Sequence, residues 1–147
     1  MEFIIREAIL KDYKEIAHIC KFDLGYTECC EEQVRDNLNN LDLQQEIVYV
    51  AVHAERVIGF IHVTKFKVLY MDLIVNIQGL AVDSEYRRYG VGTRLLMAAE
   101  KWVESIGAKY VRLNSGDIRT DAHEFYRNMG YDNEKQQIRF MKEINMR

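Results

Sequence analysis

The segment of residues 80–93 constrains the fold of this chain most, because a strand, a glycine turn and a helix meet in it. The apolar residues from Leu73 to Val82 predict a buried strand. Two arginines follow the strand, then Gly90 and Gly92, and after them a helical pattern of apolar residues begins. A strand that leads through glycines into a helix is a typical setting for a bound anion.

The physical basis of this anion site is the backbone. The N–H groups in the first turn of a helix lack partners within the helix, and the positive end of the helix dipole lies there. Glycine lets a ligand approach the backbone closely, and Arg87 and Arg88 add positive charge. The spacing fits neither a P-loop nor a dinucleotide-binding fingerprint. The sequence therefore predicts a phosphate site of another kind.

The length and composition indicate one globular domain over residues 1–147. A chain of 147 residues with 48% hydrophobic and 29% charged residues can bury a core of its own. No apolar run approaches the ~20 residues of a membrane span. Residues 1–6 lack the pattern of a signal peptide. We expect a cytoplasmic protein with no membrane partner.

The net charge and the cysteines exclude further classes. A formal charge of -3 argues against nucleic acid as a partner, because phosphate backbones are bound by basic surfaces. Cys20, Cys29 and Cys30 have no metal-ligand spacing, so we expect reduced thiols and no metal.

The apolar patterns predict an α/β (α+β) fold with a mixed, mostly antiparallel central sheet flanked by helices. Apolar or alternating runs predict strands over residues 3–6, 47–53, 57–66, 73–82, 110–113 and 138–144. Helical spacing predicts helices over residues 10–22, over residues 29–41, from the glycine turn to Ile106, and from a cap at Thr120 or Asp121 to Met129. The crossover helix places strand 110–113 parallel to strand 73–82.

Two motifs in this order resemble those of the GNAT superfamily of acetyl-CoA-dependent N-acetyltransferases. The first is Leu80-Ala81-Val82 followed by Arg87-x-x-Gly90-x-Gly92. The second is Ala122-x-x-Phe125-Tyr126-x-x-x-Gly130-Tyr131. The resemblance covers roughly residues 3–144, and the spacing of both motifs makes it specific. It implies a GNAT-like fold and acetyl-CoA as the acetyl donor.

The resemblance also implies a cofactor site. Backbone amides of the glycine turn would hold the pyrophosphate, and the last residues of the preceding strand would bond the pantetheine arm. The residues assigned to the cofactor are Leu80, Ala81, Val82, Arg87, Arg88, Tyr89, Gly90, Val91, Gly92, Thr93 and Arg119. Arg119 occupies a place where relatives often have an asparagine.

For catalysis, the resemblance assigns Tyr126 as the acid that protonates the leaving thiolate. Many relatives carry a glutamate two or four residues before the Leu80 position, but Gln78 and Asn76 stand there and neither titrates. The base therefore stays open among other titratable residues, namely Glu28, His62, Asp72 and Asp117.

The acceptor is an amine, and a small amine, an amino sugar and a peptide amine all stay open. Its candidate contacts are Tyr26, Glu28, Asn76 and Gln78. The missing glutamate keeps an alternative alive, namely a non-catalytic acyl-CoA-binding sensor or scaffold module. Many relatives are dimers, so a homodimer is a further expectation.

Overall fold

The computed structural model describes residues 1–133 and 135–145. Residues 1–114 form one compact unit, and residues 115–147 form a second, smaller one. The single-domain interpretation of residues 1–147 stays a prediction. No helix in the described part of the chain is long and apolar enough to cross a membrane.

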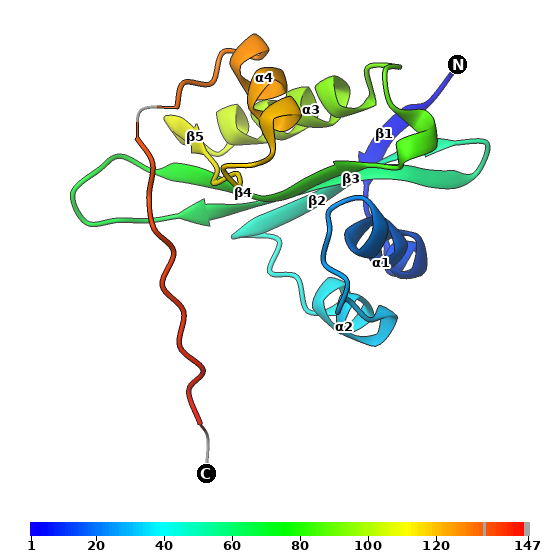
Figure 1. Cartoon of the computed structure of the whole chain (residues 1–147), viewed down its shortest axis with the longest axis horizontal. Helices are drawn as coiled ribbons and strands as arrows, with labels where there is room; N and C mark the ends of the chain where they lie inside the picture. The colour runs from blue at the N-terminus through cyan, green and yellow to red at the C-terminus, as the bar shows by residue number, and fades with distance from the viewer. Residues whose placement is uncertain (134, 146–147) are drawn as a thin grey trace. The chain divides into compact units, whose positions relative to one another are not determined.

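The first unit is built on a five-stranded sheet in the order β1-β2-β3-β4-β5 (Figure 1). The first four strands pair antiparallel, and β4 pairs with β5 in parallel. The mixed, mostly antiparallel sheet predicted from the sequence is therefore confirmed. The strands are β1 (Ile4–Glu7), β2 (Glu46–His53), β3 (Arg56–Phe66), β4 (Ile74–Val82) and β5 (Tyr110–Arg112).

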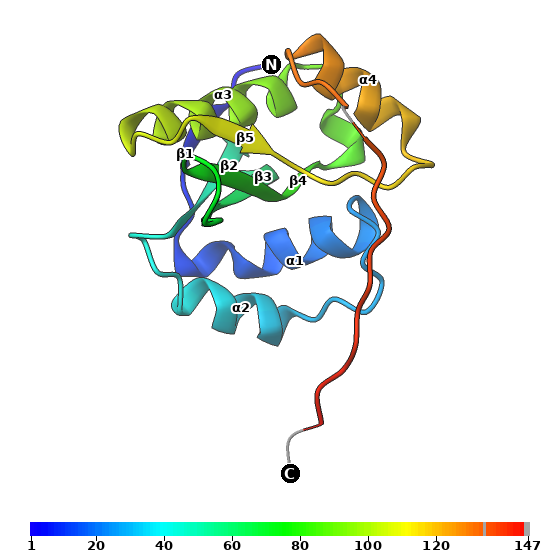
Figure 2. The same cartoon turned by 90° about the vertical axis from the view of Figure 1, so that its left-hand side faces the viewer.

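Helices cover both faces of this sheet, as Figure 2 shows. The helices α1 (Tyr13–Phe22) and α2 (Glu31–Asn39) lie on one face, and α3 (Val91–Ser105) lies on the other. Short 3-10 turns at Leu10–Asp12 and Ser84–Tyr86 precede α1 and α3. The buried residues of α3 recur at helical spacing, which is why this segment forms a helix against the sheet. They are Val91, Leu95, Leu96, Ala99 and Val103.

The two faces of the sheet can be told apart by their contacts. Val48, Phe60 and Ala81 belong to a core cluster that contains Ile16 and Ile19 of α1. On the opposite face, a Cβ added to Gly59 would lie 3.2 Å from Leu95 Cδ1 of α3. A glycine at position 59 therefore allows α3 to approach the sheet closely.

The second unit contains one helix, α4 (Thr120–Asn128). Gly130 follows the helix with φ +91°, a left-handed conformation that glycine adopts without strain. The predicted helix and its end are therefore confirmed. The predicted cap at Thr120 or Asp121 was wrong, because Arg119 is the N-cap and its side chain does not cap the helix.

The prediction of a strand over residues 138–144 was wrong. These residues carry no helix or strand, and the side chains of Ile138 and Phe140 are 81% and 89% exposed. Alternation shows only that a segment suits a strand. A strand forms when a neighbouring strand accepts and donates its backbone hydrogen bonds, and the segment has none.

The packing of α3 predicts a sharp difference between two residues of the same helix. Leu95 is fully buried against the sheet, whereas Met97 is 50% exposed. Leu95→Ala leaves a cavity and should lower the free energy of unfolding by ~2–5 kcal/mol. Met97→Ala should change it by less than ~0.5 kcal/mol. Urea denaturation measures both, and equal losses would contradict this packing.

Candidate active site

The predicted anion site is the turn between β4 and α3. Gly90 is the N-cap of α3 with φ +80°, and Arg88 also adopts a positive φ of 71°. Because glycine has no side chain, the first N–H groups of α3 lack the acceptor that a serine or aspartate cap would supply. The first helical backbone hydrogen bond at this end runs from the Arg94 N–H to the Gly90 carbonyl, at 3.1 Å. These free N–H groups can bind an anion.

Side chains that precede this turn hold the backbone leading into it. Asp83 is buried, and its Oδ1 accepts a hydrogen bond from the Glu85 N–H at 3.0 Å. Arg87 lies 3.7 Å from a carboxylate oxygen of Asp23, so part of its charge is already balanced. Arg88 and Tyr89 have exposed side chains. The N–H groups of the turn are therefore better placed than Arg87 to bind a phosphate.

The strand β4 has a free backbone side in the stretch that leads to this turn. Its parallel pairing with β5 covers only Ile74, Val75 and Asn76. From Ile77 to Val82, β4 keeps its partner β3 on one side but has no strand on the other within residues 1–114. On that side the Val82 carbonyl accepts from Arg87 Nε at 3.4 Å. N–H and C=O groups there that have no partner can bond an extended ligand as a strand would.

The predicted residues of β4 differ in burial. Ala81 is buried in the core on the α1 face, and Leu80 and Val82 are half-buried. A register shift in the β3–β4 pairing leaves Gln78 as an extra residue between Gly79 and Ile77. This bulge lies within the stretch of β4 that has no second partner strand.

A group of polar side chains on β2, β3 and β4 lies on the face of the sheet that α1 and α2 cover. His62 shares this face with Phe60, since the two are separated by two positions on β3. Thr64 is the next residue on that face, and Asn76 lies opposite it in the register. His62 Nε2 lies 2.7 Å from Glu46 Oε1, and both side chains are half-buried.

The structure brings Asn76 and Gln78 together and adds two residues that the sequence analysis did not assign. The Asn76 amide donates to Gln78 Oε1, and Arg112 Nη1 donates to Asn76 Oδ1 at 2.7 Å. Neither Arg112 nor Glu46 was a candidate. A single arginine in the otherwise apolar run of β5, Tyr-Val-Arg-Leu, was the available signal for the first.

Tyr26 and Glu28 lie on the loop between α1 and α2, with exposed side chains. The loop is closed by backbone bonds, of which the Tyr26 N–H to the Cys20 carbonyl is 3.0 Å long. Within residues 1–114, neither side chain forms a hydrogen bond with β4. Their assignment to the acceptor stays a prediction.

Tyr126 and Arg119 belong to the second unit. The Tyr126 ring lies on α4 with ring centroids 5.2 Å from Phe125 and 5.8 Å from Tyr131. Burial raises the pKa of the Tyr126 hydroxyl, and the nearby charge of Arg119 lowers it by a smaller amount. The net effect keeps Tyr126 protonated at neutral pH, which is the state that a proton donor needs.

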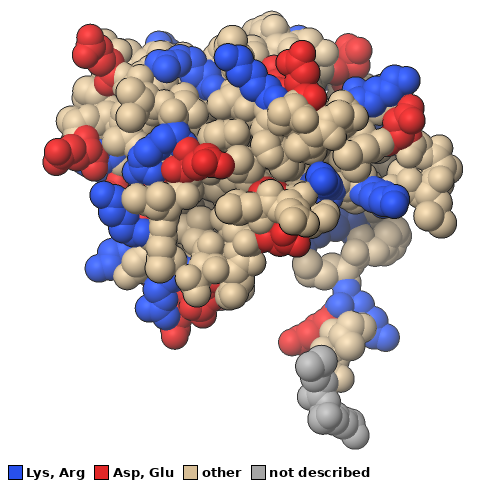
Figure 3. All heavy atoms as spheres, turned by 180° about the vertical axis from the view of Figure 1, so that it is seen from behind, with Lys and Arg blue, Asp and Glu red and all other residues tan. Residues whose placement is uncertain are grey.

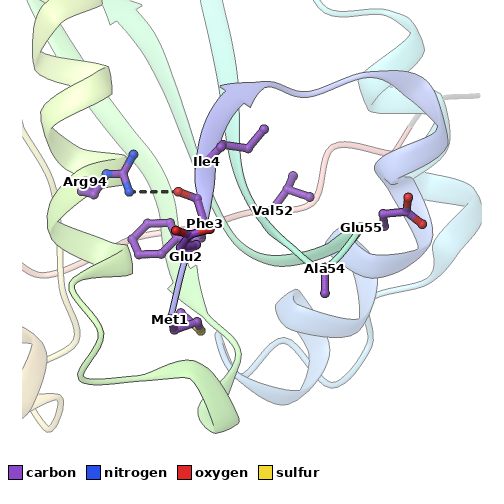
Figure 4. A pocket seen from close by; sticks show the side chains of 8 residues that line it. All are labelled: Met1, Glu2, Phe3, Ile4, Val52, Ala54, Glu55 and Arg94. Atoms are coloured by element: carbon purple, nitrogen blue, oxygen red, sulfur yellow. Dashed lines mark hydrogen bonds between the residues drawn. The ribbon is translucent and has the colours of Figure 1, made fainter.

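A pocket of about 650 Å³ lies elsewhere in the first unit, at the edge strand β1 (Figure 4). Two strands separate β1 from β4. Arg94 of α3 points into this pocket, donates to the Phe3 carbonyl at 3.0 Å, and stacks over the Phe3 ring. Arg94 is therefore engaged with β1, although it follows the anion turn directly.

The charge and ligand chemistry of the surface add two observations. Acidic and basic side chains intermingle over the face shown in Figure 3, without a large patch of one sign. Among residues 1–133 and 135–145, no group of three or more His, Cys, Asp or Glu side chains could hold a metal ion.

Comparison with known proteins gives concordant matches. The acetyltransferase (GNAT) family matches residues 7–131. An aminoalkylphosphonate N-acetyltransferase of Salmonella typhimurium is 29% identical over 146 residues, which covers 95% of this chain and 90% of that protein.

Two solved structures show the same fold. A transcriptional regulator from Bacillus halodurans C-125 superposes with a TM-score of 0.85 at 21% identity, over 96% of this chain and all of the other. The aminoglycoside N-acetyltransferase AAC(6')-Iy, in complex with CoA, superposes with a TM-score of 0.83 at 16% identity, over 97% of this chain and 96% of the other. Since the family match spans most of its length, the chain belongs to the acetyltransferase (GNAT) family.

Proposed function

We propose that this protein transfers the acetyl group of acetyl-CoA to the amine of a small acceptor beside β4. The observation that carries the proposal is that two binding features, one on β4 and one at the start of α3, follow each other along the chain. The side of β4 without a second strand is followed along the chain, after the 3-10 turn Ser84–Tyr86, by the uncapped first turn of α3. An extended arm that ends in a pyrophosphate needs both.

The residues present fit that cofactor. Backbone N–H groups from Arg88 to Thr93 would hold the pyrophosphate, and those of Leu80 and Val82 would bond the arm. The cofactor supplies an activated thioester. The task of the protein is then to orient the acceptor, remove its proton and protonate the leaving thiolate.

Tyr126 is the proposed proton donor to that thiolate. Its side chain is half-buried, its ring contacts the rings of Phe125 and Tyr131, and burial raises the pKa of its hydroxyl. A donor must hold its proton until sulfur develops charge, and a raised pKa ensures this at neutral pH.

His62 is the proposed base among the four residues that the sequence left open. Asp72 is already paired with Lys109 at 3.4 Å, and Glu28 and Asp117 are exposed. His62 is half-buried and oriented by Glu46. If its Nε2–H donates to Glu46, its Nδ1 is left as the acceptor for a proton from the ammonium group of the acceptor.

The similarity to an aminoalkylphosphonate N-acetyltransferase makes amino-acid-sized amines the first acceptors to test. Release of free thiol from acetyl-CoA with such a panel tests the function as a whole. Binding of acetyl-CoA with no acceptor-dependent thiol release would instead indicate a non-catalytic module.

Two glycines at opposite ends of α3 test the phosphate site. Gly90 and Gly107 have φ of +80° and +74°, and neither has atoms within 4 Å of an added Cβ. Alanine therefore introduces similar left-handed strain at either end, ~1–2 kcal/mol. Gly90→Ala should weaken CoA binding at least ~10-fold, which corresponds to ~1.4 kcal/mol. Gly107→Ala should leave affinity unchanged in isothermal titration calorimetry, and equal affinities for both variants would count against the site.

Replacement of Tyr126 by phenylalanine should lower kcat by ~10²–10⁴-fold, because the leaving thiolate loses its acid. Tyr49→Phe is the matched control, since burial also raises the pKa of Tyr49. As the pKa of Tyr126 is raised, loss of its proton should reduce activity only above about pH 10. Thiol release across neutral and alkaline pH measures both effects. Full turnover of Tyr126→Phe would exclude this role.

The base is tested by replacement of its side chain. His62→Gln should lower kcat/KM by ~10²–10⁴-fold, because the ring nitrogen that accepts the proton is lost. His53→Gln is the control, because His53 is also half-buried and its Nδ1 contacts the Glu2 carbonyl. Equal kcat/KM for His62→Gln and wild type would assign the base elsewhere.

A further inference from the structure

The guanidinium of Arg112 is held rigidly at the end of the β4–β5 pairing. Nη1 donates to Asn76 Oδ1 at 2.7 Å, and Nη2 donates to Asn114 Oδ1 at 3.1 Å. The cation also lies over the ring of Phe66, 4.8 Å from its centroid. The side chain is half-buried. Three contacts therefore fix a planar donor group beside β4.

The charge of Arg112 has no counter-ion in its own unit. Both of its hydrogen-bond acceptors are neutral amides, and within residues 1–114 no carboxylate forms an ion pair with it. Arg6 shows the usual alternative. Its two terminal nitrogens donate to the buried Asp12 carboxylate at 2.8 and 3.0 Å. A half-buried guanidinium without such a partner has the chemistry of an oxyanion receptor.

The amides beside Arg112 extend this receptor along β4. Asn76 uses its oxygen to accept from Arg112, so its nitrogen donates to Gln78 Oε1. The Gln78 amide nitrogen then has no acceptor among residues 1–114. It remains a donor, as do the N–H groups of Arg112 that are not bonded to amides. The row of Arg112, Asn76 and Gln78 therefore contains donors and no carboxylate that would compete for them.

The position of the row separates it from the proposed pyrophosphate site. At ~3.3 Å per residue, Asn76 lies ~20 Å along β4 from Val82, where the strand leads into the anion turn. Gln78 lies only ~7 Å from Leu80, the residue farther from the pyrophosphate of the two that are proposed to bond the arm. An anion at Arg112 is therefore within reach of a short acceptor.

We propose that Arg112, with Asn76 and Gln78, binds a compact oxyanion of the acceptor, namely the phosphonate, phosphate or carboxylate of an amino-acid-sized amine. This inference rests on the proposed function, since it assigns the substrate class of the same site. Arg112 is thereby a specificity residue: it holds the anionic end while the amine lies toward Leu80.

Direct binding tests the receptor without catalysis. Methylphosphonate and acetate, titrated into the full-length protein in calorimetry, separate a phosphoryl group from a carboxylate. Wild type should bind at least one of the two anions saturably. Arg35→Gln should do the same, and it is the control because Arg35 also lies over an aromatic ring, that of Tyr13. Arg112→Gln should bind at least ~10-fold more weakly, because bonds to a charged group are lost. Absence of binding, or equal binding by Arg112→Gln, would overturn the proposal.

Kinetics with matched acceptors test the specificity. Wild type should prefer 2-aminoethylphosphonate or β-alanine to propylamine in kcat/KM, and Arg112→Gln should lose ~10–100-fold of that preference, mainly through KM. Arg112→Lys should recover part of it. Unchanged CoA affinity shows that the variant is folded. If wild type acetylates no amine, the proposed function fails while the methylphosphonate titration still decides the receptor. If wild type acetylates propylamine as well as it acetylates 2-aminoethylphosphonate and β-alanine, the receptor role of Arg112 is wrong while the proposed function stands.

Discussion

The short pairing between β4 and β5 is the constraint on which the rest of the site depends. Only three residue pairs join the two strands, so β4 runs from Ile77 to Val82 with one backbone side free within residues 1–114. Unpaired backbone groups in a partly buried strand require partners. The proposed extended cofactor would supply partners to such groups, and its pyrophosphate would then bind the N–H groups at the start of α3.

The sequence predicted this region well because its signals are local. An apolar strand, glycines and a helical stripe are adjacent along the chain, and the resulting β4–turn–α3 unit is confirmed. The segment 138–144 shows the limit of such signals, since its alternation could not reveal whether a neighbouring strand exists. Arg112 shows another limit. Its partner Asn76 lies 36 positions away along the chain, and only the parallel register of β4 and β5 brings them together.

The acid and the base illustrate the same limits in the chemistry. Tyr126 was assigned through a motif, and the structure adds the burial that raises its pKa. His62 was one of four open choices, and nothing local distinguishes it in the sequence. The contact with Glu46, 16 positions earlier, is what separates it from the other three. The register between neighbouring strands decides which side chains form such contacts. The hydrophobic period of a sequence does not reveal that register.

The amide side chains at positions 76 and 78 stand where many relatives carry a glutamate, and they also leave Arg112 without a carboxylate partner on β4. A carboxylate at position 76 would lie where Asn76 Oδ1 already accepts from Arg112 at 2.7 Å, and it would form an ion pair there. The arginine would then be neutralised and could not hold an oxyanion. With amides in both places, the charge of Arg112 is not balanced by a carboxylate on β4, and the proposed base, His62, lies on β3 instead. The absence of a titratable group at positions 76 and 78 and the proposed oxyanion receptor thus have one origin, because both depend on the same two amide side chains.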